Sequence, residues 1–110
     1  MATESVYQLC SSCATSGAGT AFKLDGWRMA LGPIAVQIYT TQATAFVGTV
    51  KLQGTIASDD EVAAGTEHWS DISGAYWVSE KIDTLSFKTP YIRAYVPTLS
   101  TGAISIRIAY

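Results

Sequence analysis

The sequence is poor in charged residues. Only 15% of its 110 residues are Asp, Glu, Lys or Arg, the formal net charge is −2, and the seven cations are scattered singly along the chain. Proteins that bind nucleic-acid backbones neutralise several neighbouring phosphates with clustered cations, so we expect no nucleic-acid partner. A small soluble monomer normally carries more surface charge than this chain does. We therefore expect part of the surface to be covered by other subunits.

Long apolar runs are also missing. No segment approaches the roughly 20 apolar residues that are needed to span a bilayer. Residues 1–8 contain neither the basic start nor the apolar stretch that is typical of a secretory signal. We expect no membrane partner, and we expect the chain to be made in the cytoplasm and used without passing through a translocon.

Groups that bind metals or transfer electrons are few. His68 is the only histidine, and Cys10 and Cys13 form an isolated Cys-x-x-Cys pair. A structural zinc site needs four ligands, and a redox motif of this kind is typical of a βαβ context that the sequence lacks. The sequence favours two reduced thiols in a loose segment, which form a local disulfide only on oxidation.

Catalytic motifs are absent from the sequence as well. It has no Gly-x-Ser-x-Gly, no glycine-rich phosphate loop and no His-Glu-x-x-His, and hydrolysis requires a base beside a nucleophile or two carboxylates across a cleft. We predict a protein that is not an enzyme and has no cofactor and no metal site. Four acidic residues, Asp59, Asp60, Glu61 and Glu67, share one loop without the ligand spacing of a calcium loop. We interpret this loop as solvated, and cation binding there stays open.

Short alternating segments are what the sequence does contain. Ile104, Ile106 and Ile108 fall on one side of an extended chain, and Ser105 and Arg107 fall on the other, which is typical of a half-buried strand. Turn residues bound each such segment. The expected strands are 34–40, 46–56, 68–72, 75–82, 85–88, 90–96 and 103–110, with a further apolar segment through Phe22, Leu24 and Trp27 and one helical turn at 62–64. This pattern predicts an all-β fold, a single β-sandwich or jelly-roll-like domain of seven or eight strands.

The domain is expected to span residues 20–110. Residues 1–19 are rich in Ser, Thr, Ala and Gly and have no sustained period, so we predict a flexible N-terminal arm there.

The strand through residues 91–96 suggests an interaction surface. If Ile92, Ala94 and Val96 are core residues, Tyr91, Arg93 and Tyr95 form an outward aromatic–Arg–aromatic stripe, and these residue types are enriched at interface hot spots. The alternative is a solvent-facing stripe that pairs across strands with Arg107 or Ser105. We expect Trp69, after the acidic loop, to cap one end of the core.

The order of these elements resembles a β-sandwich module of tailed-bacteriophage virion proteins, particularly head decoration (capsid cement) proteins. The resemblance is carried by the residues Phe22-Lys23-Leu24-Asp25-Gly26-Trp27, Ile34 to Tyr39, Thr49-Val50-Lys51-Leu52-Gln53-Gly54-Thr55, Trp69-Ser70-Asp71-Ile72, Thr89-Pro90-Tyr91-Ile92-Arg93-Ala94-Tyr95-Val96 and Thr101-Gly102-Ala103-Ile104-Ser105-Ile106. It implies a structural protein on the surface of the phage head. The implied partners are the major capsid protein and further copies of the chain, with a trimer as one option.

In such an assembly we expect the arm to dock on a neighbouring subunit, with Tyr7 and Leu9 as interface residues. Two alternatives stay open. Trp27, Trp69, Trp77 and six tyrosines also suit a carbohydrate-binding β-sandwich module. Another virion part, such as a head–tail connector or a fibre base, would share the same strand pattern.

Overall fold

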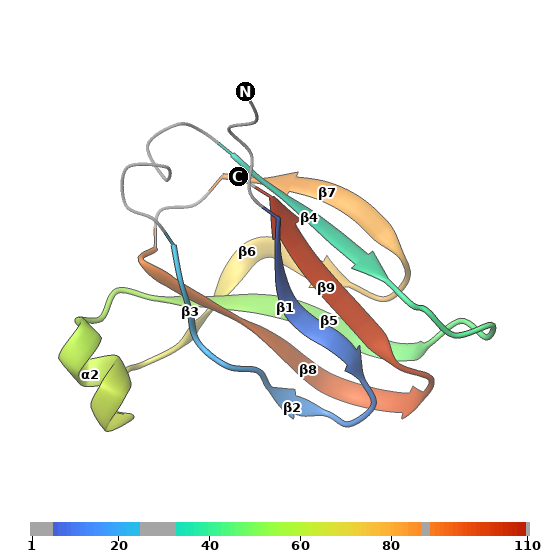
Figure 1. The fold of residues 1–110 in the computed structure, drawn as a ribbon, viewed down its shortest axis with the longest axis horizontal. Coiled ribbons are helices and arrows are strands. Elements are labelled where there is room, and N and C mark those ends of the chain that lie inside the picture. Colours follow the sequence, from blue (N-terminus) through green and yellow to red (C-terminus); the bar gives the residue numbers. More distant parts are fainter. Residues whose placement is uncertain (1–5, 25–32, 87–88, 110) are drawn as a thin grey trace.

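The computed structural model describes residues 6–24, 33–86 and 89–109. Within these ranges the chain forms nine strands and one short helix (Figure 1). The elements are β1 (Val6–Cys13), β2 (Gly17–Ala18), β3 (Phe22–Lys23), β4 (Ile34–Tyr39), β5 (Val47–Thr55), α2 (Asp59–Ala64), β6 (Ser70–Trp77), β7 (Lys81–Leu85), β8 (Tyr91–Thr101) and β9 (Ile104–Ala109).

The strands form two antiparallel sheets. One sheet has the order β1-β9-β4-β7, and the other has the order β2-β8-β5-β6, with β3 also paired to β8. β2 and β3 lie end to end along β8 and together occupy the place of one strand. The pairs are then nested: β1 pairs with β9, β2 and β3 pair with β8, β4 pairs with β7, and β5 pairs with its neighbour β6. This nested pairing is the order of a jelly roll, and it confirms the expected all-β sandwich.

The core lies between the two sheets. Alternate residues of β4, β5, β8 and β9 point inward because successive side chains of a strand face opposite ways. The buried set includes the isoleucines of β4 and β9, and on the other sheet Val50, Leu52, Ile92, Ala94 and Val96. These are the positions that the alternation predicts, except that Ile56 follows the end of β5 and is 83% exposed.

The sequence predicts a flexible arm over residues 1–19 and a sandwich over residues 20–110, whereas in the structure residues 6–13 and 17–18 are already strands of the sandwich. β1 is an edge strand of the four-stranded sheet and pairs with β9, while β2 pairs with β8 of the other sheet. Register shifts interrupt β1 between Gln8 and Cys10 and between Cys10 and Cys13. These irregularities remove the simple period-2 pattern from the sequence, so the sequence predicts a loose segment where the structure has a bulged strand. Residues 1–5 lie outside the described residues.

Other predicted boundaries also differ: β8 continues to Thr101 where the predicted strand ends at residue 96. β6 is continuous through Ser73-Gly74, where a turn was expected, because β5 pairs with it on both sides of this point. Gly74 has a φ of +84° and forms an irregularity within the strand. The chain instead bends after Trp77 and resumes as β7 at Lys81.

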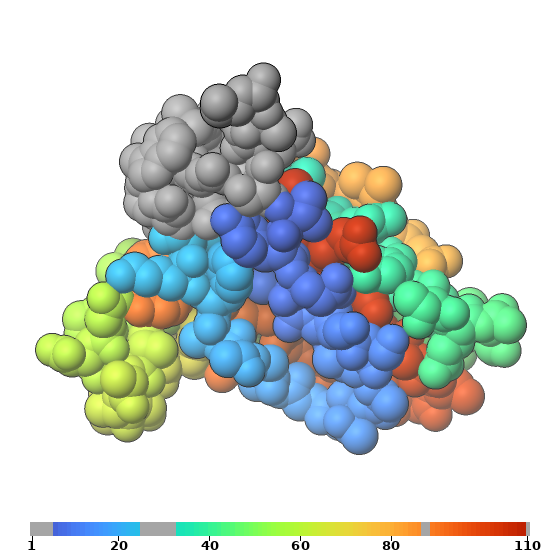
Figure 2. Space-filling view, viewed as in Figure 1, coloured from blue at the N-terminus to red at the C-terminus, as the bar shows by residue number. Residues whose placement is uncertain are grey.

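The predicted helical turn in the acidic loop is confirmed as α2. Ser58 caps its N-terminus and Glu61 reaches back to the Ser58 backbone, a capping box, while Gly65 ends it with a φ of +73°. None of its residues is buried, and the space-filling view shows α2 standing out from the body of the molecule (Figure 2).

Candidate functional site

The outer face of the five-stranded sheet gathers polar and aromatic side chains from three strands. Tyr76, Lys51 and Tyr95 are in register across β6, β5 and β8, and Asp71, Gln53 and Arg93 form the next row. Trp69, just before β6, adds a ring beside Arg93. We call this surface the polar–aromatic face; its residues are Lys51, Gln53, Trp69, Asp71, Tyr76, Arg93 and Tyr95.

Hydrogen bonds fix the second row. Lys51 Nζ donates to Asp71 Oδ2 at 2.9 Å, and Gln53 Nε2 donates to Asp71 Oδ1 at 3.0 Å. Arg93 Nε donates to Gln53 Oε1 at 2.8 Å, and its Cζ lies 4.6 Å from the centre of the Trp69 ring. Because each side chain is held by its neighbour, Arg93 and Trp69 are ordered before any partner arrives, which lowers the entropy lost on binding.

The charges on this face are partly compensated. The Gln53 amide and then the Lys51 ammonium hold the pKa of Asp71 below its ordinary value, and the hydrogen bond to Asp71 raises the pKa of Lys51. Arg93 is paired with a neutral amide and a ring. The face therefore offers a guanidinium and aromatic rings rather than a strong field of one sign.

Tyr91 does not belong to this open surface. It faces outward from β8 but is buried, and its hydroxyl donates to Asp59 Oδ1 at the start of α2. Lys23 Nζ on β3 lies 2.9 Å from Asp59 Oδ2. The Tyr91 hydroxyl and then Lys23 hold the pKa of Asp59 below its ordinary value, and the same bond raises the pKa of Tyr91. Of the predicted stripe, Arg93 and Tyr95 remain accessible, and Tyr91 fastens α2 to the sheet.

Tyr7 and Leu9 contact this chain's own core. Both are partly buried against the core cluster, and the ring centres of Tyr7 and Phe22 are 4.9 Å apart. Since β1 and β3 belong to different sheets, this ring pair closes the gap between the two layers at one edge. The prediction that these residues dock on a neighbour does not fit the side chains' inward position.

The tryptophans have different environments. Trp77 is buried in the core, and its Nε1–H donates to Asp83 Oδ2 at 3.2 Å. Trp69 is half-buried against Arg93 on the outer face rather than capping the core. Trp27 lies outside the described residues. A ligand that stacks on rings would therefore meet Trp69, Tyr76 and Tyr95 and not Trp77.

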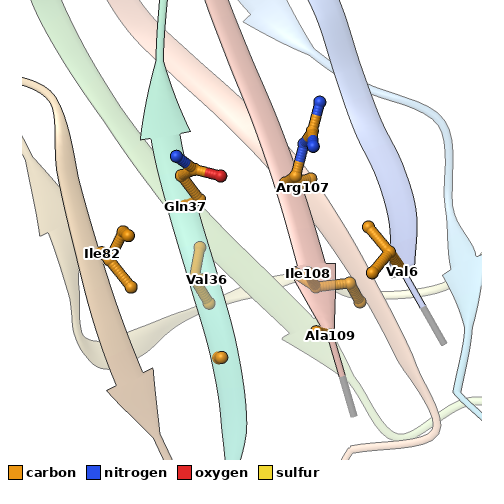
Figure 3. A pocket seen from close by; sticks show the side chains of 8 residues that line it. Val6, Val36, Gln37, Ile82, Arg107, Ile108 and Ala109 are labelled. Carbon is orange, nitrogen blue, oxygen red and sulfur yellow. The ribbon is translucent and has the colours of Figure 1, made fainter. Parts of the chain in front are cut away.

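The outer face of the four-stranded sheet has a different character. Ala35 and Ala109 are in register on β4 and β9 and form the floor of a shallow apolar depression (Figure 3). Val6 and Ile82 flank it from β1 and β7 and are 62% and 69% exposed. Arg107 also lines the depression. Its Nη2 donates to Tyr39 Oη at 2.8 Å, and this hydrogen bond lowers the pKa of Tyr39.

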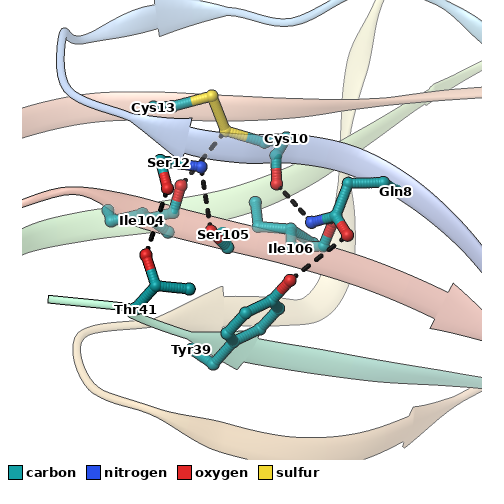
Figure 4. The surroundings of a disulfide bond; sticks show 9 residues. All are labelled: Gln8, Cys10, Ser12, Cys13, Tyr39, Thr41, Ile104, Ser105 and Ile106. Atoms are coloured by element: carbon teal, nitrogen blue, oxygen red, sulfur yellow. Dashed lines mark hydrogen bonds between the residues drawn. A yellow bond between two sulfur atoms is a disulfide. The ribbon is translucent and has the colours of Figure 1, made fainter.

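Cys10 and Cys13 are joined in a disulfide, with 6.0 Å between their Cα atoms (Figure 4). The expectation of two reduced thiols in a loose segment therefore differs from the structure, in which both cysteines lie on β1. The disulfide is the local bond that the sequence allowed on oxidation, and the register shift between the two residues places their Cα atoms within bonding reach.

Two of the four carboxylates in the acidic loop have partners within the chain. Asp59 accepts a hydrogen bond from the Tyr91 hydroxyl, and the Glu61 side chain accepts one from the Ser58 backbone N–H at the α2 N-terminus. His68 is exposed. Among the residues that the structure describes, no group of three or more His, Cys, Asp or Glu is placed to hold a metal ion. In the same ranges no helix is long and apolar enough to cross a membrane.

Sequence reasoning missed Lys51, Gln53 and Asp71. The signal was present for the first two, because they alternate with the core residues Val50 and Leu52 and must face outward. Their alignment with Asp71 and Arg93 depends on strand pairing, which the sequence does not reveal.

Comparison with known proteins bears on the architecture. No family model matches the chain, and no curated protein matches its sequence. The crystal structure of the SPBc2 prophage-derived protein YomS matches with a TM-score of 0.66 at 8% sequence identity, over 96% of this chain and 90% of that chain. The chain is similar in fold to YomS. At this identity the likeness concerns the fold, and it extends over almost the full length of both chains.

Proposed function

We propose that this chain is a structural protein of a phage particle, a decoration protein that binds the outer surface of the head and stabilises it through contacts between subunits. The observation that carries the proposal is the full-length similarity in fold to a prophage-derived protein. The jelly-roll order of the strands supports it, since this architecture recurs in viral capsid domains.

The polar–aromatic face is the surface proposed to meet the major capsid protein. Arg, Trp and Tyr are the residue types that contribute most to protein–protein hot spots, and Arg93, Trp69 and Tyr95 lie together there. The hydrogen bonds through Gln53 and Asp71 hold the arginine in place. Such a preformed surface suits a partner that is itself rigid and present in many copies.

Contacts between copies of the chain are proposed at the apolar depression. Its alanine floor and the exposed Ile82 lie on one face, so two copies related by a two-fold axis could each insert Ile82 into the other's depression. Ile82→Lys is expected to reduce the mass of the oligomer measured by sedimentation. Val47→Lys, which places the same charge at an exposed apolar site on β5 of the other sheet, is the matched control.

The capsid proposal is tested by adding the purified chain to heads that lack it. The expected result is saturable binding with many copies per head and a rise in the temperature at which the heads release their contents. Failure to bind, together with unchanged heat resistance, would remove the proposal. Few copies located on the tail axis would indicate a connector or a fibre base instead.

A carbohydrate-binding role is the second candidate, because Trp69, Tyr76 and Tyr95 lie on one face with polar neighbours and jelly rolls also occur in lectins. Binding to a glycan array that is lost on Trp69→Ala would favour this role. Silence on the array alongside saturable head binding would favour decoration.

A further inference from the structure

The segment from Leu9 to Gly19 connects the two sheets and is held to the second of them over a short stretch. We call it the β1–β2 corner. It leaves the four-stranded sheet at Cys13 and joins the other sheet through β2, which pairs with β8 over only two residues, Gly17 and Ala18. One further hydrogen bond, from Gly19 N–H to Ala94 O at 2.7 Å, follows β2. The corner therefore depends on what holds the end of β1.

The end of β1 is held by the disulfide and by the residue inside it. Ser12 has a φ of +50°, which is an unfavourable backbone conformation for a residue other than glycine. Its N–H donates to Ser105 Oγ at 2.9 Å, and its hydroxyl lies 3.2 Å from Thr41 Oγ1 (Figure 4). The four-residue ring closed by Cys10 and Cys13 keeps Ser12 in this conformation, so the covalent bond and the two hydrogen bonds support one another.

Solvent can reach the disulfide. A hollow of about 170 Å³ lies under the corner and is lined by both cysteines, by the exposed Thr15 and Ser16, and by Ala94 and Val96 of β8. Cys10 is buried, whereas Cys13 is partly exposed. Cys13 Sγ is therefore the sulfur that an incoming thiolate meets first.

The fold also has a place for the reduced form. Cys10 Sγ lies 3.3 Å from the carbonyl oxygen of Ile104. Once the disulfide is broken, the Cys10 S–H can donate to this oxygen, so reduction does not leave a buried polar group without a partner.

We infer that the Cys10–Cys13 disulfide is a thiol-reducible clasp, and that low-molecular-weight thiols release the β1–β2 corner by opening it. In the first step a thiolate attacks Cys13 Sγ, the Cys10–Cys13 bond breaks, and Cys10 leaves as a thiolate that takes up a proton. A second thiolate then attacks the external sulfur of the mixed disulfide and releases Cys13. The two small thiols are oxidised to their disulfide, and the protein gains two thiols.

The inference does not rest on the proposed function. It predicts two states of the sandwich. The strands β4, β5, β8 and β9 are the same in both states, and the β1–β2 corner is held in place only when Cys10 and Cys13 are joined. A chain made in a reducing cytoplasm would begin with a released corner, and an oxidising environment would fasten it.

The test is amide hydrogen exchange on the full chain in glutathione buffers, with thiol labelling measured in parallel. In reduced glutathione we expect both cysteines to take the label and the amides of residues 9–19 to exchange about 20-fold faster, from the chain entropy of a four-residue loop. Amides of β4 and β9 outside contact with the corner are expected to keep their rates. Cysteines that stay unlabelled in the folded protein, or a corner with the same exchange rate in both buffers, would overturn the inference.

Two variants sharpen the test. Cys13→Ser keeps Cys10 and its contact with Ile104 and is expected to exchange like the reduced protein in both buffers. Glycine adopts a positive φ without a disulfide ring to hold it there. In Ser12→Gly the difference in exchange rate of the corner between oxidised and reduced protein is therefore expected to shrink. A difference in Ser12→Gly as large as in the original chain would refute the role of the Ser12 backbone.

Discussion

Two arginines on opposite faces of the sandwich make a matched pair. Arg93 lies 4.6 Å from the Trp69 ring and donates to Gln53, and Arg107 lies 4.7 Å from the Tyr39 ring and donates to its hydroxyl. The perturbation is Arg93→Ala, and Arg107→Ala is its control. Both replacements remove the same residue type and the same kinds of contact, but only one alters the polar–aromatic face.

The expected loss of stability is similar for the two variants. Each loses one hydrogen bond, contributing about 1 kcal/mol, and one cation–π contact, contributing about 1 kcal/mol. The free energy of unfolding should fall by about 2 kcal/mol in each case. For a chain of this length that lowers the melting temperature by about 8 °C, measured by calorimetry or circular dichroism.

The expected effects on capsid binding differ. A hot-spot arginine contributes about 2 kcal/mol or more to association, so Arg93→Ala should weaken head binding about 30-fold. Because Arg107 lines the depression proposed for contacts between copies, the mass of the oligomer is measured for both variants. With that mass unchanged, Arg107→Ala should leave the affinity within about threefold. Binding is measured below the melting temperature of both variants by titrating heads that lack the protein.

Two results would refute this reasoning. Equal weakening by both variants would mean that the effect comes from stability, or that the contact surface is not the polar–aromatic face. An unchanged melting temperature in Arg93→Ala would mean that the contacts with Gln53 and Trp69 contribute no net stability.

Three further predictions concern the fold and its charges. Leu52 is 0% exposed, so Leu52→Ala should cost about 2–5 kcal/mol in urea unfolding, whereas Val47→Ala at an exposed site should cost less than about 1 kcal/mol. At Gly48 an added Cβ would lie 2.5 Å from Thr98 O and 2.9 Å from Leu99 Cα, so Gly48→Ala should cost about 1–3 kcal/mol, and an unchanged urea midpoint would contradict the close approach of β5 and β8. The pKa of Asp71 is lowered in the folded state, so its contribution is present above the ordinary carboxyl pKa and is lost as pH falls through the lowered value. The urea midpoint should then drop more between pH 5 and about pH 2 in the original chain than in Asp71→Asn, and parallel curves would refute it.

The alternation of apolar and polar residues predicted the core strands because it depends only on residues that are near neighbours in the sequence. Successive side chains of a strand face opposite ways, so Val50 and Leu52 lie on one side of β5 and Lys51 and Gln53 lie on the other. The same rule failed at β1, where bulges shift the alternation, and at Gly74, where a glycine that usually marks a turn lies inside a strand. Both exceptions arise from pairing with a strand that is distant in sequence.

The candidate site was only partly foreseeable for the same reason. Arg93 and Tyr95 were expected to face outward, opposite buried residues, and they do. That the hydroxyl of the buried Tyr91 would donate to Asp59 depends on where the chain that follows β5 carries Asp59. Likewise, the row formed by Asp71, Gln53 and Arg93 exists only once three strands are in register.

Local patterns in the sequence were enough to predict the short strands, the side of each strand that is apolar, and the helical turn in the acidic loop. These follow from backbone geometry and from hydrogen bonds between near neighbours. The pairing of β1 with β9, the bulge between Cys10 and Cys13, and the set of side chains that share an outer face follow only from the packed fold. Strand pairing and register are set by how two apolar layers fit together across the core, and no local pattern encodes that fit.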